Sequence, residues 1–463
     1  MADNTKYLKE WRKNIVDRIA EARAAKGWTQ AQLAQSLGTQ RSNISRLESG
    51  THNPSLDFLL RVVAVLDMEI DLKPLKKEEF IQYGNIYELR IYDEILLTFT
   101  LEEAGIEGLK ARIVNENEKL KHLLPLDLTM TEDGVLKWLQ HRVIPKNRTF
   151  VEEILKALNL SINNTKGIID VCKGLSLNDS YWIVPQNFPG TYAKYSLYDN
   201  RFSEILSLVA YTGVSQSAGR FTTSPELTTN GMLPKAWRFL EDDGIYLYKG
   251  GSSGAANTGN EPFCEYYACQ IAQAMGLDSV IYDLERWKGL LASKCKLFTD
   301  ADTAFIPTGR VVRTGGLKAV MNYYDELGDD FLENLKSMLV FDAVVYNEDR
   351  HFGNFGILRD NQSGTIIAPA PLFDHGLSLF CYAMKDDFVM IDEYAKTRAP
   401  AYGGTTFEGI CSEVAGKPQL QQLRRLIGFS FTRHPSINWS EERLAATEKH
   451  IQKRVRQLLG LVR

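Results

Sequence analysis

Apolar residues in the first part of the chain recur every three or four positions, the spacing that gathers them on one face of a helix. One such stripe runs from Ile15 to Ala24 and stops at Gly27. The next stretch opens with Thr29, a good N-cap, and closes at Gly38, which accepts the left-handed conformation that ends helices. The pattern predicts two helices joined by a tight turn.

Two further short helices are expected before residue 70. The first covers Gln40–Glu48, with Thr39 as its cap, and the second begins at Asn53–Ser55 and runs through Leu66. A short helix, a glycine turn and a second short helix form the helix-turn-helix arrangement, which lays its second helix in the major groove of DNA. This segment is therefore expected to be an all-α DNA-binding domain.

Alternating and helical patterns are mixed in the rest of the chain. Ile86–Tyr92 alternates like a strand, and helices are expected over Thr131–Gln140 and Phe150–Leu158. The later segments predict a strand, a helix, a hairpin and three more helices, over residues 244–249, 261–275, 280–298, 317–324, 331–346 and 441–459. The expected fold class is multidomain α+β.

Composition narrows the function only a little. The 463 residues are 44% hydrophobic and 24% charged, as in an ordinary globular protein. Residues 1–77 carry a net charge of +4 and the remainder −8. This asymmetry fits a basic N-terminal domain that binds nucleic acid, followed by an acidic remainder of the chain. No apolar run approaches the ~18 residues of a membrane span, no signal core stands at the N-terminus, and no pair of the six cysteines has metal-ligand spacing. A cytoplasmic protein without membrane partners is expected.

Asp349, Asn354 and Asp374 are the most informative polar residues. Phosphoryl transfer from ATP needs an acidic group that accepts the proton of the attacking hydroxyl, and oxygen ligands that hold Mg²⁺ on the phosphates. An Asp, an Asn five residues on and a second Asp about twenty residues later is the spacing of kinase-type sites. Strands expected over 355–358 and 365–370 would bring Asp374 back beside Asn354. The alternative is a pair of charged surface loops.

A family resemblance is carried by the run Asp349-Arg350-His351-x-x-Asn354-Phe355. This run resembles the catalytic loop of HipA-like serine/threonine kinases, bacterial toxin-type enzymes with a distant protein-kinase fold. The resemblance extends upstream, with gaps, to about Ser215. It implies a bilobal fold with a β-rich N-lobe and a helical C-lobe. It also implies that Asp349 is the catalytic base, that Asn354 and Asp374 hold Mg²⁺, and that ATP is the phosphate donor.

Kinases also need a strand-borne lysine on the α/β-phosphates and a helix-borne glutamate that holds this lysine. Lys249 lies at the end of an alternating strand, and Glu265 lies on the next expected helix in the Glu-Tyr-Tyr motif of the family. The resemblance further implies that residues 228–235 cover the phosphates, with Lys235 as a second basic group. It places the backbone that binds adenine at Lys296–Phe298.

Three hydroxyl residues, Ser224, Thr228 and Thr229, match the place where the family can autophosphorylate. A phosphate there would add about −1.5 to −2 charge and could pull the loop out of the nucleotide site. Upstream, Arg142 and Arg148 are expected on an exposed loop, where they are candidates for gripping an anion. A solvated loop without such a role is the alternative.

The first seventy residues carry a second resemblance. The motif Thr-Gln-Ala-Gln-Leu-Ala…Ile-Ser-Arg-Leu-Glu-Ser-Gly, within residues ~12–72, is similar to the λ-repressor-type (XRE) family. The match implies a phosphate contact from Gln30 and base-edge contacts from Arg41, Ser42, Asn43 and Arg46. Such modules usually bind operator DNA as two-fold dimers, so a homodimer is expected, but nothing in this segment identifies its surface.

These interpretations give four predicted segments: the DNA-binding domain (1–74), a small α/β leader without assigned chemistry (75–165), the kinase N-lobe (166–300) and the helical C-lobe with the catalytic loop (301–463). The leading hypothesis is a growth-inhibiting toxin kinase that represses its own promoter. By resemblance, its substrates would be translation proteins such as aminoacyl-tRNA synthetases. Two alternatives stay open: a transcription regulator whose kinase-like domain senses nucleotide without catalysis, and a small-molecule phosphotransferase.

Overall fold

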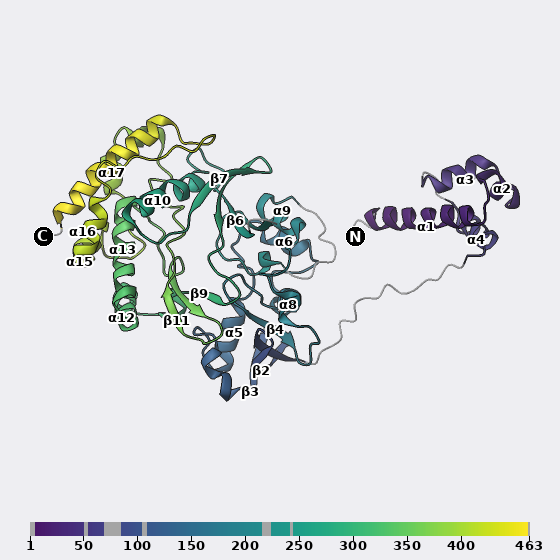
Figure 1. Cartoon of the computed structure of the whole chain (residues 1–463), viewed down its shortest axis with the longest axis horizontal. Helices are drawn as coiled ribbons and strands as arrows, with labels where there is room; N and C mark the ends of the chain where they lie inside the picture. Colours follow the sequence, from purple (N-terminus) through teal and green to yellow (C-terminus); the bar gives the residue numbers. More distant parts are fainter. Residues whose placement is uncertain are drawn as a thin grey trace. The chain divides into compact units, whose positions relative to one another are not determined.

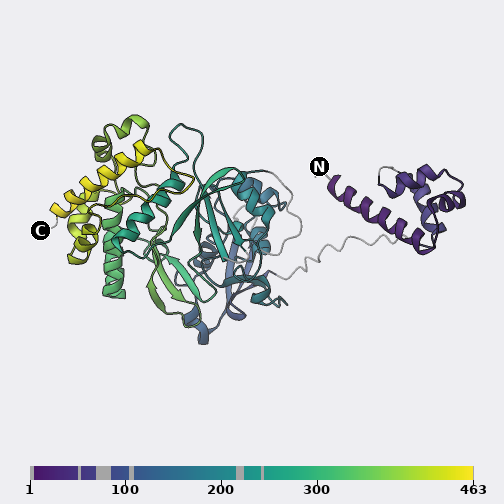
Figure 2. The same cartoon turned by 45° about the horizontal axis from the view of Figure 1, so that its top comes forward.

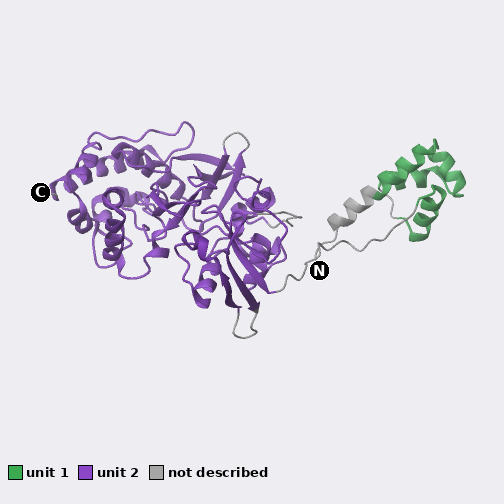
Figure 3. Cartoon of the chain, turned by 60° about the horizontal axis from the view of Figure 1, so that its bottom comes forward, with its two compact units in different colours: residues 1–82 green, residues 83–463 purple. Residues whose placement is uncertain are grey.

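The computed structural model describes residues 5–50, 54–68, 85–103, 109–214, 224–240 and 244–461. The chain divides into two compact units, residues 1–82 and 83–463 (Figure 3). The predicted domain boundary at residue 74 lies outside the described residues. The predicted boundaries at residues 165 and 300 both fall inside the larger unit.

The described part of unit 1 is helical, as the apolar spacing predicts. Its helices are α1 (Thr5–Ala25), α2 (Gln30–Ser36), α3 (Arg41–Glu48) and α4 (Leu56–Val65). Leu33, Ile44 and Val62 are fully buried in the core that α2, α3 and α4 share. The turn between α2 and α3 contains Gly38 at φ +64°, a conformation that glycine adopts at little cost.

Helix caps in unit 1 follow the prediction with one exception. Thr29 caps α2 in a capping box, and Ser55 caps α4. The prediction that Thr39 caps α3 is wrong, because Gln40 occupies the N-cap position and makes no side-chain bond there. The Thr39 hydroxyl instead accepts a hydrogen bond from the side chain of Asn43 at 2.9 Å.

Unit 2 begins with an antiparallel sheet in the order β3-β2-β1-β4. Its strands are β1 (Ile86–Ile91), β2 (Glu94–Glu103), β3 (Leu109–Glu116) and β4 (Tyr181–Pro185). The helices α5 (Glu132–Gln140), α6 (Val151–Lys156) and α7 (Thr165–Cys172) come between β3 and β4 in the sequence, and α5 packs on β3. Because β4 pairs with β1, the leader segment and the start of the predicted N-lobe share one sheet.

A second antiparallel sheet, in the order β5-β6-β8-β7, carries the predicted nucleotide-binding elements. Its strands are β5 (Lys235–Leu240), β6 (Gly244–Gly250), β7 (Tyr282–Trp287) and β8 (Leu290–Lys296). The helix α9 (Glu204–Thr212) packs on β5, and α10 (Glu261–Met275) packs on β7 and β8. Lys288 and Gly289, both at positive φ, form the two-residue turn that closes the β7–β8 hairpin.

The helical lobe is built around α13 (Asp329–Val345), whose residues 337–345 are all buried. It packs against α12 (Gly316–Leu327), α15 (Phe407–Val414), α16 (Lys417–Arg424) and α17 (Glu441–Leu461). A small sheet in the order β11-β10-β9 contains β9 (Thr303–Pro307), β10 (Gly356–Asp360) and β11 (Ile366–Pro369). The shorter helices are α8 (Tyr192–Tyr195), α11 (Thr308–Val311), α14 (Ile391–Lys396), η2 (Glu118–Leu123), η3 (Pro225–Leu227) and η4 (Lys385–Phe388).

Figures 1 and 2 show α12, α13 and α15–α17 gathered at one end of unit 2, away from β1–β4. The predicted fold class, a helical head followed by a strand-rich lobe and a helical lobe, is therefore confirmed. Among the residues that the structure describes, none of the helices combines the length and the apolar composition needed to cross a membrane.

Candidate active site

Lys249 is held between two carboxylates that come from different elements. Its Nζ, near the end of β6, donates to Glu265 Oε1 of α10 at 2.8 Å and to Asp374 Oδ1. Glu265 is fully buried, and its other oxygen accepts from the backbone N–H of His375 at 2.7 Å. A strand, a helix and the segment after β11 therefore meet at one ammonium group, as the predicted Lys–Glu pair requires.

Asp374 follows β11 at a φ of +56°, a left-handed conformation that Asp tolerates better than most residues. Its backbone N–H donates to the hydroxyl of Tyr282 at 3.1 Å. Burial alone would raise the pKa of Asp374, but the Lys249 ammonium holds that pKa well below its ordinary value. Asp374 is therefore a charged carboxylate that already faces a cation.

One arginine ties the predicted catalytic loop, which contains Asp349 and Asn354, to the segment that carries Asp374. Arg350 donates to the backbone oxygens of Asn354 at 2.9 Å and Phe373 at 2.5 Å, and it forms a buried ion pair with Asp342 at 3.0 Å. The chain at Asn354 and the chain just before Asp374 therefore approach the same guanidinium. Between these two chain segments lies the predicted hairpin of β10 and β11, which reverses the direction of the chain.

Asp349 and Asn354 are joined within the loop. The backbone oxygen of Asp349 accepts from Asn354 Nδ2 at 2.9 Å, so the amide nitrogen turns into the loop and Oδ1 remains as the atom that can bind a cation. Burial raises the pKa of Asp349, and the negative charge of Asp374 adds to the rise. A carboxylate with a raised pKa accepts a proton more readily, which suits a general base.

The donor set of these residues fits Mg²⁺ on ATP. Mg²⁺ takes oxygen ligands, and in nucleotide sites one or two carboxylates share it with the phosphates of the substrate. Asp374 and Asn354 offer a carboxylate and an amide oxygen. The contact of Asp374 with Lys249 also shows that positive charge is accommodated at this carboxylate.

Lys235 lies beside Lys249, because it opens β5 directly opposite Lys249 on β6. Its Nζ donates to the backbone oxygen of Asn230 at 2.9 Å. Gly231 stands at φ +91°, and a Cβ at this position would lie 2.2 Å from that Nζ. Burial, together with repulsion from Lys249, lowers the pKa of Lys235 to about 7. The segment of residues 228–235 therefore places a second basic side chain, Lys235, next to Lys249 in the sheet.

The three predicted phosphorylation sites lie in the segment that leads to this loop. Ser224 and Thr228 are buried. The Thr228 hydroxyl donates to the Leu175 backbone oxygen at 2.7 Å, and the Thr229 hydroxyl donates to that of Pro225 at 2.6 Å. A kinase would reach Ser224 or Thr228 only if this segment opened, and autophosphorylation stays a prediction.

The predicted adenine hinge is occupied in part by sheet hydrogen bonds. The backbone N–H of Leu297 donates to the Ile245 oxygen at 2.9 Å, so it is engaged with the neighbouring strand. Lys296 is exposed at the end of β8. The ring of Phe298 packs against that of Phe373 at 5.5 Å, next to Asp374. Phe298 therefore contacts the residue that directly precedes Asp374, a predicted metal ligand.

The structure corrects the expectation for the two leader arginines, because both are buried rather than on an exposed loop. Arg142 pairs with Asp179 at 2.6 Å, and Arg148 pairs with Glu226. Neither guanidinium is left to grip an anion. Tyr282, which holds the backbone of Asp374, was not found from the sequence, where nothing distinguishes it from other strand tyrosines.

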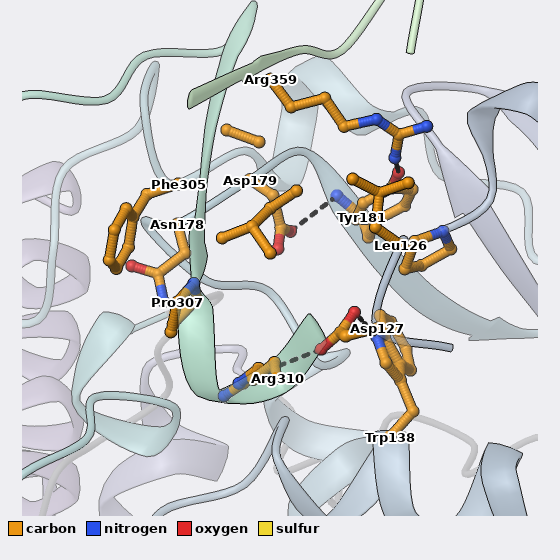
Figure 4. A pocket seen from close by; sticks show the side chains of 13 residues that line it. Leu126, Asp127, Trp138, Asn178, Asp179, Tyr181, Phe305, Pro307, Arg310 and Arg359 are labelled. Carbon is orange, nitrogen blue, oxygen red and sulfur yellow. Dashed lines mark hydrogen bonds and ion pairs between the residues drawn. The ribbon is translucent and has the colours of Figure 1, made fainter. Parts of the chain in front are cut away.

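A pocket elsewhere in unit 2 lies between the leader and β9 (Figure 4). Its charged groups are already partnered: Asp127 accepts from Arg310 at 3.2 Å, Asp179 pairs with Arg142, and Arg359 donates to the Tyr181 hydroxyl at 2.8 Å. Of these contacts, the one between Asp127 and Arg310 holds the leader against the helical lobe. These charged groups offer no unpaired charge to a ligand, so we do not assign a site here.

In unit 1, the residues predicted to contact DNA lie on α3 and at the start of α2. Arg41, Ser42 and Arg46 are exposed, whereas Asn43 is half-buried and bonded to Thr39. The side chain of Gln30 donates to Glu48 Oε2 at 2.9 Å, and Glu48 also pairs with Arg23. Three of the four residues predicted to contact bases are thus exposed to solvent, whereas the side chain of Gln30 is hydrogen-bonded to Glu48 of the same unit.

The comparison with protein families matches the helix-turn-helix family HTH_3 over residues 19–73. Through unit 1, this chain belongs to the helix-turn-helix family. The prediction made from the spacing of the first helices is therefore confirmed. A 54-residue stretch, 12% of this chain, is also 41% identical to an uncharacterized HTH-type transcriptional regulator of Archaeoglobus fulgidus, of which it covers 77%.

Two solved structures resemble larger parts of this helix-turn-helix protein. One is the Helicobacter pylori proinflammatory kinase CtkA, with a TM-score of 0.41 and 21% identity, covering 49% of this chain and 92% of that one. The other is a chain of the Shewanella oneidensis MR-1 toxin–antitoxin complex of HipA, HipB and operator DNA, with a TM-score of 0.48 and 11% identity, covering 81% of this chain and 97% of that one. Because both identities are low, the chemistry of the site has to be derived from this chain's own residues.

Proposed function

We propose that unit 2 is an ATP- and Mg²⁺-dependent kinase that phosphorylates a serine or threonine of a protein. The observation that carries the proposal is the meeting of Lys249 with Glu265 and Asp374, with Arg350 holding the catalytic loop to the same segment. Kinases use such a strand lysine, helix glutamate and metal-binding aspartate.

Each residue has a defined task in this proposal. Asp349 accepts the proton of the substrate hydroxyl while the hydroxyl oxygen bonds to the γ-phosphorus and the bond to ADP breaks. Lys249 binds the α/β-phosphates. Lys235 adds positive charge from residues 228–235, the segment that would cover the phosphates. Asn354 and Asp374 would hold Mg²⁺, which neutralises charge on the phosphates when it is bound.

We propose that unit 1 binds double-stranded operator DNA, with α3 in the major groove. The exposed side chains of Arg41, Ser42 and Arg46 support this orientation. Together, the two units suggest a toxin-type growth inhibitor that regulates its own transcription. Its protein substrate would belong to the translation machinery, and a homodimer would match a two-fold operator.

The test is to incubate the full chain with γ-labelled ATP and Mg²⁺, with EDTA in a parallel sample, in the presence of cell extract. We expect label on serine or threonine of a protein only when Mg²⁺ is present. Label that appears only on small molecules would favour the small-molecule phosphotransferase. Tight ATP binding without any transfer, combined with ATP-dependent DNA affinity, would favour the nucleotide sensor.

A further inference from the structure

We infer that Arg148 is a positioning residue for nucleotide binding, through which the leader segment holds residues 224–235 in place over the site. The inference rests on the proposed function. The leader had no function assigned from the sequence. By this inference, it positions the segment that lies next to the nucleotide site.

All four hydrogen-bond acceptors of the Arg148 guanidinium belong to the segment 224–235. Nη1 donates to the backbone oxygens of Glu226 at 2.5 Å and Thr229 at 3.5 Å. Nη2 donates to the Glu226 carboxylate and to the backbone oxygen of Lys235 at 2.9 Å. One side chain therefore contacts the beginning, the middle and the end of the segment.

The next residue adds a fifth contact, because the backbone N–H of Thr149 donates to the Met232 oxygen at 2.9 Å. The side chains of Arg148 and Glu226 are both completely inaccessible to solvent. Glu226 Oε1 also accepts from the backbone N–H of Trp237 on β5 at 2.7 Å. A buried ion pair is stable only when additional hydrogen bonds offset its desolvation. Here Arg148 Nε has no hydrogen-bond partner among the described residues, and the bonds of Nη1 and Nη2 all go to residues 224–235.

This loop matters for the site because it ends at Lys235. Lys235 pairs in the sheet with Lys249, and its Nζ reaches back to the Asn230 oxygen, so the fold of the loop decides where this ammonium lies. The charge of Asp374 acts on Lys235 as well. A change in the loop at Arg148 would therefore displace the second basic group from the phosphates.

The other side of the leader is fixed to the helical lobe. Arg359 on β10 donates to the Leu124 backbone oxygen at 2.9 Å. Arg310 donates to Asp127 of the leader at 3.2 Å (Figure 4). The leader thus contacts β10, the strand that follows the catalytic loop, and also residues 224–235. It can therefore set the position of residues 224–235 relative to the catalytic loop.

The experiment is to measure the dissociation constant of a non-hydrolysable ATP analogue with Mg²⁺ for the full chain and for Arg148→Lys. Lysine keeps the charge but cannot supply the planar fork that reaches several acceptors. We expect the dissociation constant to rise about tenfold. A second variant, Arg148→Met with Glu226→Gln, removes both charges together and should show the same rise if it folds.

Two controls separate positioning from a general loss of structure. Arg142→Lys weakens the other buried leader arginine, whose bonds go to Asp179 and Tyr181, and should leave the dissociation constant within twofold. In a Lys235→Met background, Arg148→Lys should change the constant less than twofold, because the group it positions is gone. Equal effects in both backgrounds, or an equal effect of Arg142→Lys, would overturn the inference. Absence of nucleotide binding by the wild type would instead contradict the proposed function.

Discussion

Glu265→Gln tests the lysine–glutamate pair with the least change in shape. The glutamate oxygens accept from Lys249 at 2.8 Å and from the His375 backbone at 2.7 Å. Glutamine keeps one oxygen but places an NH₂ group against one of these two donors. The buried site therefore loses one charge-assisted bond, which is worth about 1.5–3 kcal/mol. If the lost partner is Lys249, its ammonium stays on Asp374 and competes there with Mg²⁺.

This loss corresponds to a decrease of roughly 10- to 150-fold in kcat/KM for ATP. We also expect the Mg²⁺ concentration at half-maximal rate to rise, because Lys249 leaves Asp374 less readily. The assay is initial-rate phosphate transfer with ATP and Mg²⁺ varied separately, and thermal unfolding checks the fold. Glu285→Gln is the matched control, because Glu285 on β7 bonds Tyr248 and Lys294, neither of which has a role in the proposed site. Its kcat/KM should stay within about twofold of the wild type. A folded Glu265→Gln protein with wild-type kinetics would refute the assigned role.

Two further predictions concern the site in unit 2, and a third concerns the DNA-binding face of unit 1. The pKa of Lys235 is about 7 in the folded protein and ordinary when unfolded, so without nucleotide the unfolded state holds more protons above pH 7. The free energy of unfolding should therefore rise from pH 7 to pH 10 by up to about 1.4 kcal/mol per pH unit, and this rise should be absent in Lys235→Met denaturant titrations. Asp374→Asn should weaken Mn²⁺ binding in the presence of ATP at least tenfold in an electron paramagnetic resonance titration, and an unchanged affinity would exclude Asp374 as a ligand. Arg41→Ala should weaken binding to the cognate operator by about 1–3 kcal/mol in fluorescence anisotropy, and equal weakening on random DNA would indicate a phosphate contact instead.

Local sequence signals predicted the elements that position the site. Helix α10 begins and ends where expected, because Pro262 stands in its first turn and Gly276 at φ +78° ends it. The β10–β11 hairpin forms as the turn between its strands indicated, and Arg350 binds the backbone oxygens of both Asn354 and Phe373, the residue before Asp374. Each of these features depends on residues close to one another in the chain.

Contacts between distant segments were not predictable in the same way. Arg148 lies 78 residues from Glu226, and nothing near Arg148 indicates that a loop so far along the chain will enclose it. The hydrogen bond from the Asp374 backbone N–H to the Tyr282 hydroxyl spans 92 residues and joins the two predicted lobes. The prediction that Thr39 caps α3 was wrong for a local reason. The side chain of Asn43 donates to the Thr39 hydroxyl, in competition with the backbone N–H groups at the start of the helix.

The central claim is that Asp349 acts as the base of a phosphate-transfer reaction. The most direct measurement is the rate of label transfer from γ-labelled ATP at saturating Mg²⁺, for the wild type and for Asp349→Asn with an equal melting temperature. Loss of a general base predicts a decrease of roughly 10²- to 10⁴-fold. Equal rates for the two proteins would contradict the claim.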